Sequence, residues 1–151
     1  MKRRGKKNER KSGTLNGMPE KYTFDSEALL AFYFDEEGAD VVEDILEQIG
    51  RGSAGGNINI INLAEIYYIL SRKDPKIAEE KVKNIRLMGL KVVPVEDDGL
   101  WREAALLKSK YSMSLADAFA VATAKVFKTT LVIGSDREFD GVKVSLLRMR
   151  K

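Results

Sequence analysis

Four acidic side chains stand at positions where a folded sheet would bring them together: Asp25, Glu65, Asp117 and Asp136. Asp25 and Asp136 follow short β-prone runs, and the other two lie where helices are expected to begin. In an open parallel α/β sheet, functional groups collect outside the carboxyl ends of the strands. Carboxylate oxygens are the ligands that hard cations such as Mg²⁺ and Mn²⁺ prefer. The four positions therefore favour a carboxylate site for a divalent metal.

Each acid also has an ordinary structural explanation. Glu65 stands three residues after Asn62, and Asp117 three residues after Ser114, which is the spacing of a helix capping box. For Glu65 taken alone, the capping box is the better interpretation. The coincidence of four acids at one edge of the sheet favours a site.

The composition excludes several kinds of chemistry. The chain has 151 residues, enough for one domain with its own core, and it contains no Cys and no His. Thiolate nucleophiles, disulfides and His-based acid–base catalysis are thereby excluded, and carboxylates, hydroxyls, Lys, Arg, Tyr or an oxygen-bound metal remain. No apolar run is long enough to span a bilayer, and no signal peptide is visible. We therefore expect a cytoplasmic protein without a membrane partner.

Positive charge is concentrated at the N-terminus. Residues 1–17 hold seven Lys and Arg side chains and one Glu, a net charge of +6, whereas residues 18–151 carry −3 of the chain's total of +3. Because residues 1–17 lack apolar periodicity, we predict a disordered basic extension. It is either an arm that binds nucleic acid or an extension upstream of a native start at Met18. Residues 18–151 are expected to form one domain.

From Tyr22 onward, short β-prone runs alternate with amphipathic helical patterns. Strands are expected at 22–25, 57–61, 91–95, 130–133 and 142–147, with helices between them and a flexible loop at 51–56. Ser26 and Asn62 are the expected N-caps of the helices that follow the first two strands, and Trp101 is expected in the core. This alternation predicts a mostly parallel sheet wrapped by helices.

Four ordered motifs make the chain resemble the PIN domain family, and within it the VapC-like toxin ribonucleases. The motifs are Phe24-Asp25-Ser26, Asn62-Leu-Ala-Glu65-Ile, Ser114-Leu-Ala-Asp117-Ala-Phe and Leu131-Val-Ile-Gly-Ser-Asp136. The resemblance extends from about Tyr22 to Leu147 and leaves the basic extension unexplained. It implies a three-layer α/β/α sandwich with a mostly parallel central sheet and an endoribonuclease that depends on Mg²⁺ or Mn²⁺. It also implies a homodimer and an antitoxin protein that covers the acidic cleft.

The resemblance assigns Asp25, Glu65, Asp117 and Asp136 to the metal site. We expect Asp25 and Asp117 to bind the metal directly, and Glu65 and Asp136 to act through water. Hydrolysis of a phosphodiester needs a nucleophilic water and stabilised phosphoryl charge, and in a chain without His a metal is the simplest source of both.

One position departs from the family's motif. Many relatives have Thr or Ser two residues before the last acid, where this chain has Gly134. Ser135 offers a hydroxyl nearby, and Glu138 and Asp140 are further acids beside the last motif. The number of metals therefore stays open.

Basic side chains near the motifs have two interpretations. Lys125, Lys128 and Arg137 are candidates for binding RNA phosphates, and otherwise they are ordinary solubilising charges. The main alternative function is a non-catalytic PIN-like module that binds RNA or protein. A haloacid-dehalogenase-type phosphatase would need an Asp where Glu27 stands, and a receiver domain would need an acid where Ser26 stands.

Overall fold

The computed structural model of the protein describes residues 14–15 and 18–151. Its strands are β1 (Thr14–Leu15), β2 (Met18–Phe24), β3 (Ala54–Asn59), β4 (Lys91–Val93), β5 (Thr130–Ile133) and β6 (Leu146–Arg148). Its helices are α1 (Ser26–Tyr33), α2 (Ala39–Gly50), α3 (Ile60–Ser71), α4 (Pro75–Leu87), α5 (Asp98–Lys110), α6 (Leu115–Phe127) and the short 3₁₀ helix η1 (Arg137–Phe139). None of the described helices is long and apolar enough to cross a membrane.

The central sheet is parallel, and its strand order changes direction at β2. Five strands pair in parallel in the order β4-β3-β2-β5-β6, and β1 pairs with β2 in antiparallel orientation. The chain leaves β2 towards β3 on one side and later returns to β5 on the other side. Such a switch point opens a crevice beyond the carboxyl ends of the two strands. The predicted mostly parallel sheet is confirmed, and its crevice lies where β2 and β5 end.

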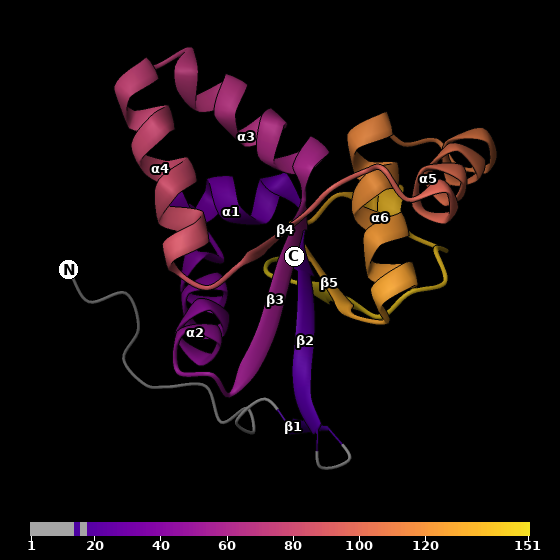
Figure 1. The fold of residues 1–151 in the computed structure, drawn as a ribbon, viewed down its shortest axis with the longest axis horizontal. Helices are drawn as coiled ribbons and strands as arrows, with labels where there is room; N and C mark the ends of the chain where they lie inside the picture. Colours follow the sequence, from indigo (N-terminus) through magenta and orange to yellow (C-terminus); the bar gives the residue numbers. More distant parts are fainter. Residues whose placement is uncertain (1–13, 16–17) are drawn as a thin grey trace.

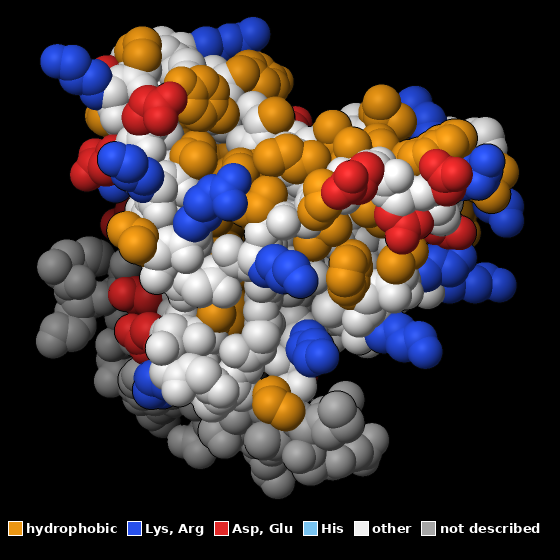
Figure 2. Space-filling model, viewed as in Figure 1, with side chains coloured by type: hydrophobic (Ala, Val, Ile, Leu, Met, Phe, Trp, Pro, Cys, Tyr) orange, Lys and Arg blue, Asp and Glu red, His pale blue; other side chains and the backbone are white. Residues whose placement is uncertain are grey.

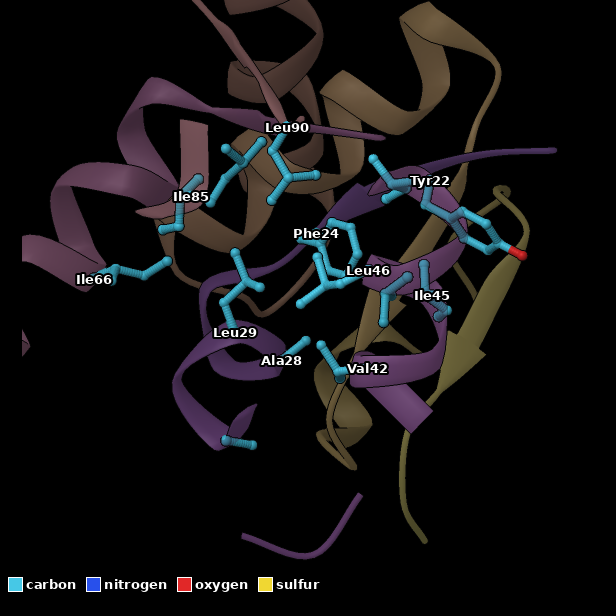
Figure 3. Close-up of a cluster of buried hydrophobic side chains, with 14 of the residues drawn as sticks. Tyr22, Phe24, Ala28, Leu29, Val42, Ile45, Leu46, Ile66, Ile85 and Leu90 are labelled. Atoms are coloured by element: carbon cyan, nitrogen blue, oxygen red, sulfur yellow. The ribbon is translucent and has the colours of Figure 1, made fainter. Parts of the chain in front are cut away.

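Helices cover both faces of the sheet, as Figure 1 shows: α1 to α4 lie on one side of the strands and α5 and α6 on the other. One core lies between β2, β3 and the first four helices, and a second lies between β5 and the last two helices. In the first core, Phe24 is fully buried among apolar side chains of α1 and α2, including Leu29 and Leu46 (Figure 3). The three-layer α/β/α sandwich is confirmed.

Small residues let α6 pack closely on the sheet. Ala118, Ala120, Ala122 and Ala124 are all buried, and short side chains bring the helix backbone near the strands. The helix begins as predicted, because the backbone N–H of Asp117 donates to the Ser114 hydroxyl at 3.0 Å. The N-terminal end of α6 is thereby held beside the carboxyl end of β5.

Several element boundaries differ from the sequence-based predictions. The loop expected at 51–56 is shorter than predicted, since its last three residues belong to β3 and pair with β2. Gly56 suits a packed strand because a Cβ there would come within 2.5 Å of Ile49 Cδ1 and 2.7 Å of Leu90 Cδ2. The last strand covers Leu146–Arg148 instead of 142–147. Low β-propensity hid the first of these segments.

The structure also bears on the predictions for Trp101 and for the N-terminal extension. Trp101 is 41% exposed, and its indole N–H donates to Asp98, so the prediction of a core position is wrong. Thr14–Leu15, inside the predicted disordered extension, form β1 beside the start of β2. The rest of residues 1–17 lies outside the described residues.

Candidate active site

Asp25 connects the end of β2 to the start of α1. Its backbone N–H donates to the carbonyl of Val132 in β5 at 3.0 Å, which fixes the two strand ends together. Asp25, and not Ser26 as predicted, is the N-cap residue of α1, yet its side chain makes no capping hydrogen bond. The side chain is only 2% exposed, and Oδ1 has no hydrogen-bond partner within the described part of the chain. A buried carboxylate oxygen is thus left for another ligand.

Glu65 does not belong to a capping box. Helix α3 begins earlier than predicted, at Ile60, and its N-cap is Asn59, whose side chain accepts from the N–H of Ile61 at 2.8 Å. Asn62 instead lies buried inside the helix and donates to the carbonyl of Ala116 in α6. The capping interpretation of Glu65 is therefore wrong.

The Glu65 carboxylate reaches towards α1. Its Oε1 accepts a hydrogen bond from the hydroxyl of Ser26, the residue that follows Asp25. This bond joins the second and first motifs, although they are far apart in sequence. It holds the Glu65 carboxylate beside Asp25.

A second group of acids forms around the start of α6. Asp117, Asp136 and Glu138 each offer a carboxylate oxygen, and these oxygens lie within 4.8 Å of one another. Asp136 is the N-cap of η1, and its side chain accepts from the N–H of Glu138 at 2.9 Å. The 3₁₀ turn after β5 thereby directs both acids to Asp117.

The two groups line one open pocket of about 470 Å³. Asp25, Glu65, Asp117 and Asp136 all contribute to its wall, as does Glu138. The expected convergence of the four acids is therefore observed at the carboxyl ends of β2 and β5. Their roles in binding or catalysis stay a prediction.

Crowding and burial shift the ionisation of two of these acids. Burial raises the pKa of Asp25 well above its ordinary value, and the negative charges of Asp117, Glu65 and Glu27 raise it further. Burial, with a hydrogen bond to Glu138, raises the pKa of Asp117 to about 7. In both cases the charged form is disfavoured in the absence of a cation.

These features fit the divalent metal that the fold family implies. The donor set consists of oxygens, which suits Mg²⁺ or Mn²⁺, and His and Cys are absent from the chain. The unpartnered Oδ1 of Asp25 would gain a ligand, and a cation would offset the burial and the like-charge repulsion that raise the pKa of Asp25. Asp117, Asp136 and Glu138, whose oxygens lie together, and Asp25 and Glu65 in the same pocket are the residues that would hold it.

The other predicted residues lie outside this pocket. Ser135 is half-buried between β5 and η1 without lining the pocket, and Asp140 forms an ion pair with Arg148. The candidate RNA-binding residues are also elsewhere. Lys125 pairs with Glu103 of α5 at 2.8 Å, while the exposed Lys128 ends α6 and the exposed Arg137 lies in η1.

Three charged residues of the pocket were missed by sequence reasoning. Glu27, Glu36 and Arg150 line it together with the four acids, and Arg150 forms ion pairs with both glutamates. Glu27 had a signal in the sequence, since it stands two residues after Asp25 in the first turn of α1. Nothing in the sequence near Arg150 marks it, because only the return of the chain through β6 brings it to the pocket.

Comparison with known proteins supports this assignment. The sequence profile described as the PIN domain matches residues 22–144. No significant match was found among curated proteins. Solved structures with the same fold include DNA-bound VapBC from Salmonella typhimurium, with a TM-score of 0.68, 14% identity and coverage of 86% of this chain and 98% of that chain. VapBC2 from Rickettsia felis, bound to a promoter DNA fragment, has a TM-score of 0.67, 18% identity and coverage of 85% and 98%.

A toxin–antitoxin complex from Klebsiella pneumoniae is also similar, with a TM-score of 0.63, 16% identity and coverage of 85% of this chain and 97% of that chain. At these identities the structural matches show a shared fold. The sequence profile spans most of the chain, including the four motifs. The chain therefore belongs to the PIN domain family.

Proposed function

We propose that this protein is a metal-dependent endoribonuclease and the toxin of a toxin–antitoxin pair. The observation that carries the proposal is the buried, unpartnered Asp25 Oδ1 in a pocket that Asp117 and Asp136 also line. Membership of the PIN family supports nuclease chemistry, and the structural neighbours include toxin–antitoxin complexes. RNA as the substrate and Mg²⁺ or Mn²⁺ as the cofactor are parts of the proposal.

The protein's own residues prepare the site for a cation. Bound Mg²⁺ or Mn²⁺ would lower the pKa of a water and stabilise charge on the phosphoryl oxygens. The Ser26 hydroxyl fixes Glu65, and the turn at Asp136 orients Glu138 towards Asp117. Because burial raises the pKa of Asp117 to about 7, a part of the metal-free molecules carries a proton there at neutral pH, and metal binding displaces it. Metal affinity should therefore rise with pH.

The proposal includes protein partners. Large apolar side chains are exposed on several helices, among them Leu87 at 83%, Leu106 at 64% and Leu115 at 53%. Figure 2 shows apolar side chains gathered over the part of the molecule that α3 to α6 form in Figure 1. Exposed apolar area of this kind suits protein contacts, and we propose a cognate antitoxin and a homodimer. With RNA as the substrate, we propose a cytoplasmic location.

Cleavage of RNA tests the enzymatic part directly. Purified protein should cleave single-stranded RNA with Mg²⁺ or Mn²⁺ and stop when EDTA is added. Asp117→Asn should remove the activity. Asp98→Asn is the matched control, because Asp98 lies in the first turn of α5 and outside the pocket.

A second measurement separates the enzyme from a non-catalytic binding module. Under the nuclease proposal, excess Mn²⁺ should raise the melting temperature of the wild type and have little effect on Asp117→Asn. A protein that binds RNA without cleaving it, and whose melting temperature does not change when metal is added, would be a binding module. Cleavage that is equally fast in EDTA, with contaminating nuclease excluded, would contradict the metal mechanism.

A further inference from the structure

Arg150 is held firmly at the rim of the acidic pocket. Its Nη2 lies 2.8 Å from Glu27 Oε2, and its Nη1 donates to the carbonyl of Glu37 at 3.0 Å and lies 3.5 Å from Glu36 Oε1. The side chain is only 17% exposed. The preceding residue, Met149, is buried and donates its N–H to the carbonyl of Ile133, so the backbone is anchored beside β5.

Gly134 makes room for the residue that holds Arg150. A Cβ at Gly134 would overlap the carboxyl group of Glu27, so the Glu27 carboxylate occupies the space of the missing side chain. Glu27 is thus fixed from two sides, by the backbone at the end of β5 and by the guanidinium of Arg150. The two observations are independent, since one concerns backbone space and the other an ion pair.

The pocket contains many acids and a single base. Of the residues lining it in the described part of the chain, Arg150 alone is basic, against seven Asp and Glu side chains. A polyanion approaching such a wall meets repulsion that one divalent cation does not cancel. An arginine has more N–H donors than the contacts to Glu27, Glu36 and Glu37 use, and guanidinium groups bind phosphate with charge-assisted hydrogen bonds.

We propose that Arg150 binds a phosphate of the RNA substrate at the rim of the pocket and that Glu27, seated over Gly134, positions it. The inference rests on the proposed function. It divides the acids of the pocket into two sets. Asp25, Glu65, Asp117, Asp136 and Glu138 serve the metal, while Glu27 and Glu36 orient the arginine.

Steady-state cleavage of a single-stranded RNA with saturating Mn²⁺ tests the assignment. Arg150→Gln should raise KM about 10-fold and change kcat much less, because a charge-assisted contact to the substrate is lost. Arg150→Lys keeps the charge but lacks the planar guanidinium, so its KM should lie between those of the wild type and Arg150→Gln. Arg102→Gln is the matched control: Arg102 is an exposed arginine of α5 outside the pocket, and its removal should leave KM within about 2-fold.

Two readouts separate substrate binding from a merely structural role. The Mn²⁺-induced rise in melting temperature should persist in Arg150→Gln and in Glu27→Gln, because neither residue is assigned to the metal. In an Asp25→Asn background, which should not cleave, Arg150→Gln should weaken binding of labelled RNA and reduce the salt slope by about 0.7. Glu27→Gln, which weakens the ion pair with Arg150, and Gly134→Ala, which displaces the Glu27 carboxylate, should both raise KM.

The outcomes are distinguishable. If the wild type cleaves with metal and both Arg150 variants keep its KM and salt slope, the role of Arg150 is wrong and the nuclease proposal stands. The role of Arg150 is also wrong, and the nuclease proposal still stands, if Arg150→Gln lowers the melting temperature but leaves KM and the salt slope unchanged. If Arg150→Gln does not fold, Arg150→Lys and Glu27→Gln decide by the same criteria. If the wild type neither cleaves RNA nor responds to metal, both proposals fall.

Discussion

Asp25 has a carboxylate that is costly to keep charged in the metal-free protein. It is almost fully buried, one of its oxygens has no partner among the described residues, and three acids add repulsion. Uncompensated burial of a charge is among the most unfavourable arrangements in a protein. In a binding site, the same arrangement is relieved when the cation arrives.

We predict that Asp25→Asn leaves the metal-free protein as stable as the wild type or more stable. It should also lose most of the stabilisation by metal, which for the wild type is about 2.7 kcal/mol at a metal concentration 100 times Kd. Thermal melting with EDTA and with excess Mn²⁺ measures both effects.

Asp97→Ala is the contrasting variant, because Asp97 is a true N-cap whose side chain accepts from the N–H groups of Gly99 and Leu100. Its loss should cost about 1 kcal/mol with or without metal. If Asp25→Asn behaved like Asp97→Ala, Asp25 would be a structural residue only.

Asp117 makes the stability of the metal-free protein depend on pH. Its pKa rises from 3.8 in the reference state to about 7 in the folded protein, so between these values the folded state binds more protons than the unfolded state. The free energy of unfolding should therefore increase as pH falls from about 7 towards about 4. Urea unfolding in EDTA at a series of pH values measures this slope.

Asp117→Asn should flatten the slope, and Asp98→Asn should leave it unchanged. The raised pKa of Asp25 acts in the same direction, so part of the slope should persist in Asp117→Asn. A wild-type protein that loses stability as pH falls from 7 to 5 would contradict the crowding of these acids.

At the scale of elements, β3 depends on a residue with no side chain. Gly56 lies where Ile49 of α2 and Leu90 before β4 meet the strand. Both neighbours are buried, so neither can move far to admit another atom. The close contact between α2 and β3 is part of the first core, and β2, which ends at the pocket, packs against the same core.

We predict that Gly56→Ala destabilises the protein by about 1–3 kcal/mol through overpacking. Gly55→Ala is the matched control, because its added Cβ would meet Lys21 Cγ at an ordinary 3.5 Å. Chemical denaturation of both variants gives the comparison. Equal stability of the two would contradict the tight packing of α2 on β3.

At the scale of the whole molecule, charge is divided unevenly. The described domain from Met18 onward carries −3 overall and presents an acidic pocket, while residues 1–17 carry +6. A domain of net negative charge gains little attraction for RNA from its own surface, so a basic extension would increase the encounter rate and affinity for RNA.

We predict that deletion of residues 1–17 leaves the melting temperature nearly unchanged, because the segment contributes few apolar residues. If the extension binds RNA, its deletion should weaken RNA affinity and reduce the dependence of affinity on salt. Fluorescence anisotropy at several salt concentrations measures this. An unchanged salt slope would leave the extension without a role in RNA binding, and a large loss of thermal stability would show that residues 1–17 contribute to the stability of the fold.

Local sequence was sufficient for the features that depend on neighbouring residues. The alternation of β-prone and helical segments predicted a mostly parallel sheet wrapped by helices, since the hydrophobic period of each segment is a local pattern. The cap of α6 at Ser114 was also predictable, because the two groups in that hydrogen bond are three residues apart. Asp25, Asp117 and Asp136 were found because strand ends and helix starts can be located in a sequence, whereas Glu65 was identified by its motif although the start of α3 was misplaced.

Tertiary structure decided what those acids contact. Glu65 had the spacing of a capping box, yet α3 begins at Ile60, and the Ser26 hydroxyl, 39 residues away, is its partner. Glu27 and Arg150 are 123 residues apart and meet only because β6 returns beside β5, over a glycine that leaves space for the carboxylate. Contacts of this kind depend on register and packing across the sheet, which no local pattern encodes.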